Sequence, residues 1–157
     1  MRTVQDFEND LAAGLAFEPF VVQAFADRGL HFAVNQGARA QAEHGESDAG
    51  IEIKLDRLFR RTGNLFIETF ERRIDSGEYA SAWRGTGPYD EHEPWLLVIG
   101  DTSEFWTFTC SKLREVEGRC VLQKTPTAHG FLLPIATDAG ANAIAGIIYR
   151  DGEWIVP

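Results

Sequence analysis

The chain of 157 residues and 17.5 kDa fits one ordinary domain, because single hydrophobic cores typically occupy about 100–200 residues. Its 44% hydrophobic and 25% charged residues are those of an average globular domain and exclude a disordered chain, a collagen or a coiled coil. No apolar run approaches the roughly 18 residues that cross a bilayer, and the opening MRTVQDFEND lacks the order of a signal peptide. We therefore expect one cytoplasmic domain, residues 1–157, with no membrane partner.

The charge is acidic overall but unevenly distributed. The 15 basic and 24 acidic residues give a formal charge of -9, which argues against coating nucleic acid through bulk electrostatics. Residues 51–84 nevertheless hold seven basic and six acidic side chains, so the middle of the chain is locally basic. This segment could meet phosphate on an acidic body, or it could be a solvated face.

Apolar residues recur near helical spacing over residues 3–28, which predicts a helical N-terminus. Pro19 is expected to divide it into one helix through Leu15 and a second over residues 17–27. Gly29 is the expected stop.

The next segments read as a strand, a loop and a hairpin. Residues 30–35 are a short apolar run that predicts a strand, and residues 36–48 are polar and predict a loop. Residues 51–56 alternate strictly between apolar and charged side chains, which is typical of a half-buried strand. The turn signal at residues 62–64 and the strand-like residues 65–71 predict an antiparallel hairpin with residues 51–56.

The rest of the chain predicts shorter elements. Strands are expected at residues 95–99 and 104–109, and residues 130–135 predict either a strand or a core crossing. Short helices are expected at residues 79–83, 111–117 and 138–146, and a terminal hairpin turns at Asp151 and Gly152. Cys110 and Cys120 lack the spacing of a disulfide framework or a zinc site and read as core or surface thiols. The order of helices and strands predicts a mixed α/β fold around a sheet.

The informative stretch is residues 45–68, where acidic side chains gather around one lysine. The acidic residues are Glu46, Asp48, Glu52, Asp56 and Glu68, and the lysine is Lys54. Carboxylates that converge on one face repel one another unless a divalent cation neutralises them, and Mg²⁺ prefers oxygen ligands and phosphate. A lysine beside such a metal can orient or deprotonate an attacking water, or steady developing charge. The combination suggests phosphodiester hydrolysis.

The pairing register decides whether these groups converge. If the hairpin opposes Glu52 to Glu68, then Lys54 lies on the same face as both. A slip of one residue sends Glu68 to the side of Ile51 and Ile53, where an unpartnered carboxylate would be costly to bury. We therefore expect the register that gathers the charges.

Over roughly residues 11–110 the sequence resembles the PD-(D/E)xK nuclease superfamily, whose core is a helix, a three-stranded antiparallel meander, another helix and a strand. Glu52-Ile53-Lys54 matches E-x-K, and TGNLFIE at residues 62–68 looks like the neighbouring strand of phage or resolvase-like members. Glu18 is similar to the helical glutamate that some resolvase-like members add to their metal site. The resemblance implies a restriction-endonuclease-like fold and a Mg²⁺-dependent deoxyribonuclease, with Mn²⁺ as a substitute.

Two alignments with the family pattern are open. In one, Asp48 is the first carboxylate and Glu52-Ile53-Lys54 the second motif, across a gap shorter than the usual distance between the motif strands. In the other, Glu52 and Glu68 are the two carboxylates, Phe70 stands where the motif lysine belongs, and Lys54 substitutes from the adjacent strand. We favour the second, with Glu52, Glu68, Asp48 and Glu18 as metal ligands and Glu52, Lys54, Glu68 and Asp48 as the catalytic set.

The remaining expectations concern the substrate and the alternatives. The basic group expected to place the DNA backbone consists of Arg57, Arg60, Arg61, Arg72 and Arg73. Cutting both strands at one place usually needs two active sites, which favours a homodimeric endonuclease. The competing hypotheses are a nuclease-fold binding module without competent chemistry, which Phe70 favours, and an acidic protein-interaction domain. A P-loop is rejected, because Gly85 and Gly87 lack the downstream helix and lysine.

Overall fold

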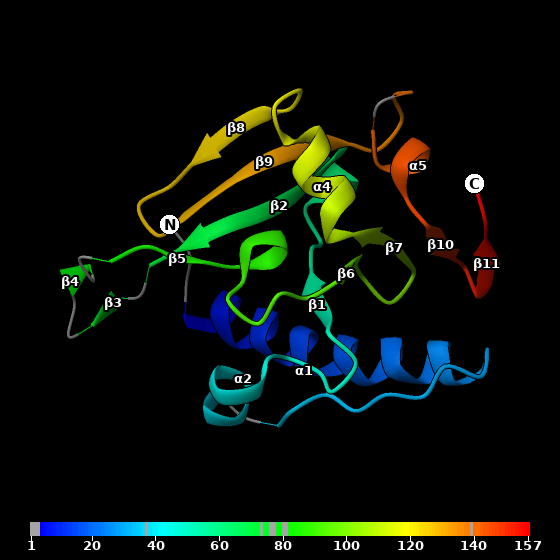
Figure 1. Cartoon of the computed structure of the whole chain (residues 1–157), viewed down its shortest axis with the longest axis horizontal. Helices are drawn as coiled ribbons and strands as arrows, with labels where there is room; N and C mark the ends of the chain where they lie inside the picture. The colour runs from blue at the N-terminus through cyan, green and yellow to red at the C-terminus, as the bar shows by residue number, and fades with distance from the viewer. Residues whose placement is uncertain (1–3, 37, 73, 76–77, 80–81, 139) are drawn as a thin grey trace.

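The computed structural model describes residues 4–36, 38–72, 74–75, 78–79, 82–138 and 140–157 (Figure 1). The helices are α1 (Val4–Ala26), α2 (Ala38–His44), α3 (Phe59–Thr62), α4 (Cys110–Glu117) and α5 (Ala141–Ile144), with a 3-10 turn η1 (Gly87–Tyr89). The strands are β1 (Ile51–Leu55), β2 (Asn64–Glu71), β3 (Ile74–Asp75), β4 (Glu78–Tyr79), β5 (Arg84–Gly85), β6 (Leu96–Gly100), β7 (Glu104–Thr109), β8 (Val121–Lys124), β9 (Ala128–Pro134), β10 (Ile147–Arg150) and β11 (Glu153–Ile155). This mixture confirms the predicted α/β class.

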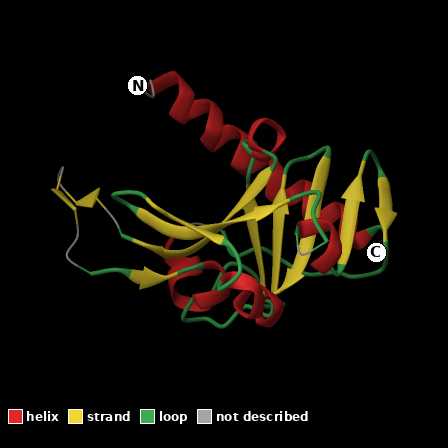
Figure 2. Ribbon diagram, turned by 90° about the horizontal axis from the view of Figure 1, so that it is seen from above, coloured by secondary structure: helices red, strands yellow, loops and turns green. Residues whose placement is uncertain are grey.

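The strands form two main sheets. The larger has the order β1-β6-β7-β10-β11, in which β1 runs parallel to β6 and the other neighbours are antiparallel. The second has the order β5-β2-β9-β8 and is antiparallel throughout, while β3 and β4 pair separately. Both groups of strands are seen from above in Figure 2.

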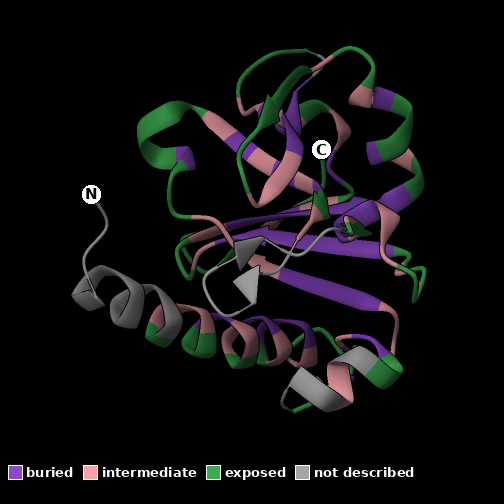
Figure 3. Ribbon diagram, turned by 90° about the vertical axis from the view of Figure 1, so that its left-hand side faces the viewer, coloured by how far each residue is buried: buried purple, intermediate pink, exposed green. Residues whose placement is uncertain are grey.

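The five-stranded sheet is covered on both faces. On one face it packs against α1, around a cluster that includes Phe17, Val21, Ile53 and Phe105. On the other face Leu97 and other apolar side chains pack against β2, β9 and α4. Figure 3 shows the buried strands of this sheet lying above α1. The sheet is therefore the middle layer of the fold.

The predicted break at Pro19 is wrong, because α1 runs through it without interruption. Proline inside a helix costs about 3 kcal/mol. Phe17, Val21 and Phe25 on the same helix are buried, and burying each such side chain stabilises by roughly 1.5–3 kcal/mol. Packing of this face therefore outweighs the lost backbone hydrogen bond. The predicted stop is confirmed by Gly29, whose φ of 83° is left-handed.

Residues 30–48 were predicted incorrectly. Residues 30–35 form no named strand, and their one bridge joins Val34 to Ser47. The predicted loop over residues 36–48 contains α2, whose Ala, Gln, Arg and Glu residues are good helix formers. The sequence already contained this helix propensity, but the glycines on both sides of the segment favoured the prediction of a loop.

The predicted hairpin between residues 51–56 and 65–71 is also wrong, although both segments are strands. β1 pairs with β6, and β2 lies in the other sheet. One oxygen of Asp56 accepts a hydrogen bond from the backbone N–H of Leu58 at 2.8 Å, and the other accepts from Phe66 at 3.0 Å. This carboxylate fixes a helical turn, α3, so the chain leaves the first sheet instead of folding back within it.

Most downstream elements agree with the sequence. Strands β6, β7 and β9, helices α4 and α5 and the terminal hairpin β10–β11 are confirmed within one or two residues at most ends. The helix predicted over residues 79–83 includes residues 80–81, which lie outside the described residues. Strand β8 was not predicted, because all four of its residues are exposed and no alternation marks it.

Candidate active site

Two rows of side chains cross the five-stranded sheet on the face toward the second sheet. In one row Lys54 lies beside Ile99 and Trp106, and in the next Glu52 lies beside Leu97. The three apolar side chains belong to the buried core between the sheets. On the edge strand β1, two charged side chains therefore occupy the positions that apolar side chains occupy on β6 and β7.

Glu52 and Lys54 form an ion pair at this edge. The Nζ of Lys54 lies 3.0 Å from Oε1 of Glu52. The alternation of β1 predicted a polar face open to water, but Glu52 is only 5% exposed. The side chain of Lys54 remains 41% exposed. The acid of the E-x-K motif is therefore buried, while its lysine reaches solvent.

Glu46 joins the pair from the loop before β1. Its Oε1 accepts a hydrogen bond from the backbone N–H of Ile53 at 3.2 Å, and its Oε2 lies 3.9 Å from Nζ of Lys54. Ser47 accepts in the same way from Ile51 at 2.8 Å. The loop thus satisfies the free edge of β1 and brings a carboxylate to the lysine. Sequence reasoning assigned Glu46 no site role, although acceptors just before an edge strand are a usable signal.

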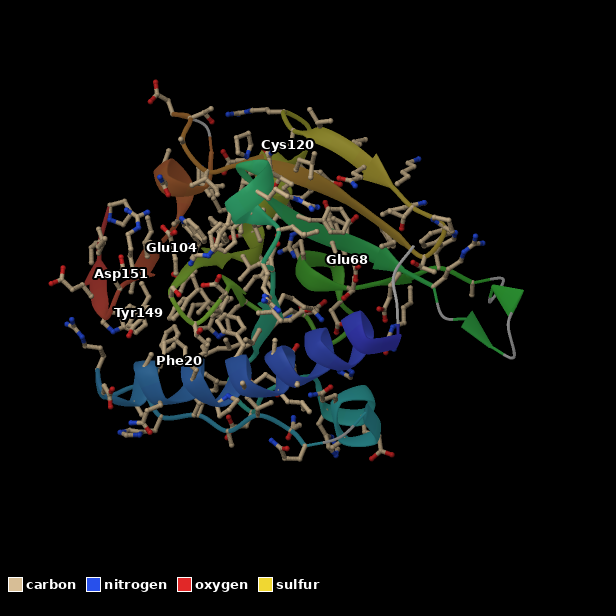
Figure 4. The ribbon with its side chains drawn as sticks, turned by 180° about the vertical axis from the view of Figure 1, so that it is seen from behind. Phe20, Glu68, Glu104, Cys120, Tyr149 and Asp151 are labelled. Carbon is tan, nitrogen blue, oxygen red and sulfur yellow. The ribbon has the colours of Figure 1, made fainter. Side chains whose placement is uncertain are left out.

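Two further carboxylates act on Lys54 from other elements. Glu68 on β2 helps to raise the pKa of Lys54, and Lys54 opposes the rise in the pKa of Glu18 on α1. Figure 4 shows Glu68 between β2 and α1. The register between β2 and β9 shifts after Glu68, and a bulge of this kind re-aims neighbouring side chains. The predicted residues Glu18, Glu52, Lys54 and Glu68 therefore converge, although not through the predicted hairpin.

Gly87 joins the two sheets beside this cluster. Its N–H donates a hydrogen bond to Oε1 of Glu52 at 3.2 Å. Its φ is 55°, and a Cβ there would lie 2.4 Å from the backbone oxygen of Glu68. Only glycine fits both the conformation and the close approach. Sequence reasoning considered Gly87 only as part of a phosphate loop, and its tertiary role left no signal in the sequence.

Burial is the main cause of the altered carboxyl groups. It raises the pKa of Glu46 and of Glu68 to about 7 in each case, against the opposing effect of Lys54. Burial also raises the pKa of Glu18, again opposed by Lys54. For Lys54 itself, burial lowers the pKa, but the charges of Glu52 and Glu46 outweigh burial and the net shift is upward. Lys54 is therefore a stable cation close to two acids, Glu46 and Glu68, that titrate near neutral pH.

One oxygen of the cluster has no hydrogen-bond partner within the described part of the chain. The Oε2 of Glu52 is fully buried, whereas its Oε1 accepts from Gly87 and contacts Lys54. Leaving a buried acceptor unsatisfied costs roughly 1–3 kcal/mol, and more for a charged group. Such an atom needs an explanation beyond stability, and a bound cation is one.

Two cavities meet at Lys54. The first, of about 340 Å³, is bordered by Glu46, Glu52 and Arg84 and is mainly polar. The second, of about 440 Å³, contains Glu68 and several apolar side chains. Lys54 lines both. The side chain of Lys54 therefore borders both a polar and a largely apolar space.

Asp48 and Phe70 bear on the two open alignments. Asp48 lines the polar cavity, but its Oδ1 accepts a hydrogen bond from the backbone N–H of Ala33 at 2.9 Å and ties two loops together. Phe70, which stands in place of the motif lysine, stacks on Tyr89 with ring centroids 5.8 Å apart. Asp48 therefore contacts the backbone of Ala33 at the polar cavity, while Glu68 lines the other cavity.

The first three arginines of the basic group lie around α3. Arg60 pairs with Asp101 through two hydrogen bonds of 2.8 and 3.0 Å. Arg61 is exposed, and Arg57 is exposed at the border of the apolar cavity. Arg57 and Arg61 therefore face solvent on the side of the site where α3 lies.

Arg72 lies directly after the end of β2. Arg72 donates a hydrogen bond to the backbone oxygen of Pro126 at 2.6 Å and lies over the ring of Trp83 at 4.9 Å. Arg73 is outside the described residues. The structure thus separates the group into a part beside α3 and a part at the end of β2.

The carboxylates of Glu52 and Glu46 lie beside the ammonium group of Lys54. Among the residues that the structure describes, no three His, Cys, Asp or Glu side chains are arranged to hold a metal ion. No described helix is both long enough and apolar enough to cross a membrane. Comparison with family models, with curated proteins and with solved structures found no match to this chain.

Proposed function

We propose that the chain is a metal-dependent DNA nuclease that hydrolyses phosphodiester bonds, acting as an endonuclease. The observation that carries the proposal is the buried Oε2 of Glu52, unpartnered among the described residues, beside a protonated lysine and two carboxyl groups that titrate near pH 7. Burying so many like charges at one point lowers stability, and function is the usual reason to retain them.

The chemical type of the available donor atoms suits a hard divalent cation. The site offers carboxylate oxygens alone, and one of them is buried without a protein donor among the described residues. Glu52 and Glu68 would hold Mg²⁺ or Mn²⁺, with Glu46 as a further ligand and Glu18 and Asp48 as lesser ones. The metal would polarise the phosphoryl oxygen and lower the pKa of a bound water.

Lys54 acts as a cation in this proposal. Because its pKa is raised, it stays protonated at neutral pH and is a poor general base. Its ammonium group instead stabilises negative charge that develops on the phosphate oxygens. Glu46, with its Oε2 3.9 Å from Lys54, can, instead of binding the metal, accept a proton from water or return it to the leaving oxygen.

The arrangement of the strands supports the proposal. A mixed sheet covered by α1 carries the E-x-K residues on an edge strand, and a second strand, β2, brings another acid to the same point. A restriction-endonuclease-like core is proposed on this arrangement, with strand pairing that differs from the expected meander.

Plasmid nicking together with thermal melting tests the proposal. Supercoiled plasmid is incubated with the protein in Mg²⁺, Mn²⁺ or a chelator. Wild type should nick DNA only with metal, and Glu52→Gln and Lys54→Ala should each lose at least about 100-fold in rate. Glu153→Gln, which neutralises an exposed acid on β11, is the matched control and should keep full activity.

The same samples separate the competing functions. Metal should raise the melting temperature of wild type and not that of Glu52→Gln, because a ligand that binds only the folded state adds stability. DNA binding without cleavage would support the inactive binding module. If the protein binds neither metal nor DNA at low salt, the result would support the acidic interaction domain.

A further inference from the structure

The largely apolar cavity beside Lys54 contributes Glu68 to the proposed metal site, and its apolar walls have no role there. Its apolar walls come from three strands and from the loop before α3, through Leu55, Leu58, Phe66, Leu97 and Ile99. Lys54 and Glu68 lie within the same lining. Its volume of about 440 Å³ falls in the range of about 300–1,000 Å³ found for small-molecule sites.

We propose that this cavity receives one unstacked nucleobase of the DNA substrate, so that the enzyme acts on single-stranded or locally opened DNA. The inference rests on the proposed function, because the base is placed relative to the phosphate that the cluster would cleave.

The division of chemistry between the two cavities supports a base as the occupant. A nucleotide is a charged phosphate joined to a flat and largely apolar ring with polar edges. The polar cavity holds Glu46 and Glu52, and the other cavity holds apolar side chains. Lys54 is common to both, so a phosphate near its ammonium group leaves the attached base within reach of the apolar walls.

Polar groups at the cavity suit the edge of a base. Arg57, which is exposed and lines the cavity, carries N–H groups that can donate to the carbonyl oxygens of a base. A base inside a duplex cannot enter such a site without unpairing, which costs a few kcal/mol. Apolar walls beside a charged cluster therefore favour DNA in which the base is already free.

Gly14 allows the cavity to be blocked from the helix side. It lies on α1 and lines the cavity, and a Cβ built there meets no atom within 4 Å. Gly14→Trp should fill this space with a ring and leave the sheet residues untouched. Gly14→Ala is the matched control, because it also removes the backbone freedom of glycine from α1 without filling the cavity.

Leu58 gives an independent variant. It is 55% exposed and lines the cavity, so Leu58→Gln makes the wall polar at little cost to the core. Leu122 on β8 is 60% exposed and is not part of this lining. Leu122→Gln is therefore the matched control for the same chemical change.

The experiment measures binding of a fluorescent, fully abasic DNA oligomer and of the same oligomer with one central thymine. Binding is measured in chelator and again in Ca²⁺, so that the readout does not depend on cleavage. Wild type should bind the one-thymine oligomer about tenfold more tightly. Gly14→Trp and Leu58→Gln should abolish the difference, whereas Gly14→Ala and Leu122→Gln should retain it.

The outcomes separate this inference from the proposed function. Equal affinity of wild type for both oligomers, or an unchanged difference in both cavity variants, overturns the base site even if plasmid is nicked. A preference for thymine that the cavity variants remove supports the site even if no nicking occurs. Thymidine added as a competitor should displace the one-thymine oligomer only weakly, and displacement at low concentration would assign the site to a free nucleoside instead.

Discussion

The same face of the five-stranded sheet is built in two different ways. Across β6 and β7 the side chains that face the second sheet include Leu97, Ile99, Trp106 and Phe108, all fully buried. One strand away, on β1, the corresponding positions are Glu52 and Lys54. An apolar row therefore changes to charge within a single strand spacing.

This difference shows where stability and function separate. The apolar part follows the rule that two packed layers bury hydrophobic side chains between them. The charged part breaks the rule with a buried carboxylate oxygen that lacks a donor among the described residues and with acids whose pKa values burial has raised. Places where local rules fail while the surrounding structure obeys them are expected to be functional.

The largest expected effect comes from removing apolar volume. Phe108→Ala should lower the free energy of unfolding by about 3–5 kcal/mol, because it leaves a cavity between the sheets. Glu52→Gln should change it by about 1 kcal/mol or less, because the amide oxygen still accepts from Gly87 and Lys54 is partly exposed to water. Urea denaturation of both variants measures the contrast. Equal losses would mean that the charged edge is part of the stabilising core.

A second effect concerns the glycine that joins the sheets. Gly87→Ala should destabilise by about 2–3 kcal/mol, because a Cβ adds a clash with Glu68 to the cost of a left-handed residue. Gly63 also has a positive φ but open space around it, so Gly63→Ala should cost only about 1 kcal/mol. Thermal melting compares the two variants. Only Gly87→Ala should also reduce the increase in melting temperature that metal causes. An equal increase in the two variants would mean that Gly87 is not part of the site.

The third effect is a loss of stability with rising pH. The pKa of Glu46 and of Glu68 rises from 4.5 unfolded to about 7 folded, so the folded state binds more protons between these values. Stability contributed by the neutral acids is full below about pH 4.5, falls as pH rises to about 7, and is then constant, with a loss on the order of 2 kcal/mol for Glu46.

Denaturation across this pH range tests the sign. Glu46→Gln should flatten the decline and keep the hydrogen bond from Ile53, because the amide oxygen can still accept it. Glu153→Gln, at an exposed position, should leave the decline unchanged. Stability that rises between pH 4.5 and 7 because of Glu46 would contradict the assigned burial effect.

The smallest effect belongs to the surface arginines. Arg60→Ala should change the free energy of unfolding by about 0–1 kcal/mol, because its pair with Asp101 is partly exposed. The double variant Arg60→Ala, Arg61→Ala should reduce the salt dependence of DNA binding by about one unit of slope per lost phosphate contact. The control removes two exposed charges elsewhere, Arg119 and Lys124. Equal slopes in both double variants would place the DNA away from α3.

The sequence by itself determined the local structure of most elements and the central pair of the site. Alternation over residues 51–55 specified a strand, and a spacing of two residues necessarily put Glu52 and Lys54 on one face of it. Strand β2 was located by its aromatic and β-branched residues and β6 by a short apolar run, because these residue types favour the extended backbone of a strand.

Only the tertiary structure decided which strands pair and which distant groups meet. Alternation says which face of β1 is polar but not that its neighbour is β6 rather than β2, because either partner satisfies the same backbone groups. Glu46 entered the site by accepting a hydrogen bond at the free edge of β1, and Gly87 by fitting where a side chain would clash with Glu68. Both roles depend on atoms brought close by folding, and no period in the sequence encodes such proximity.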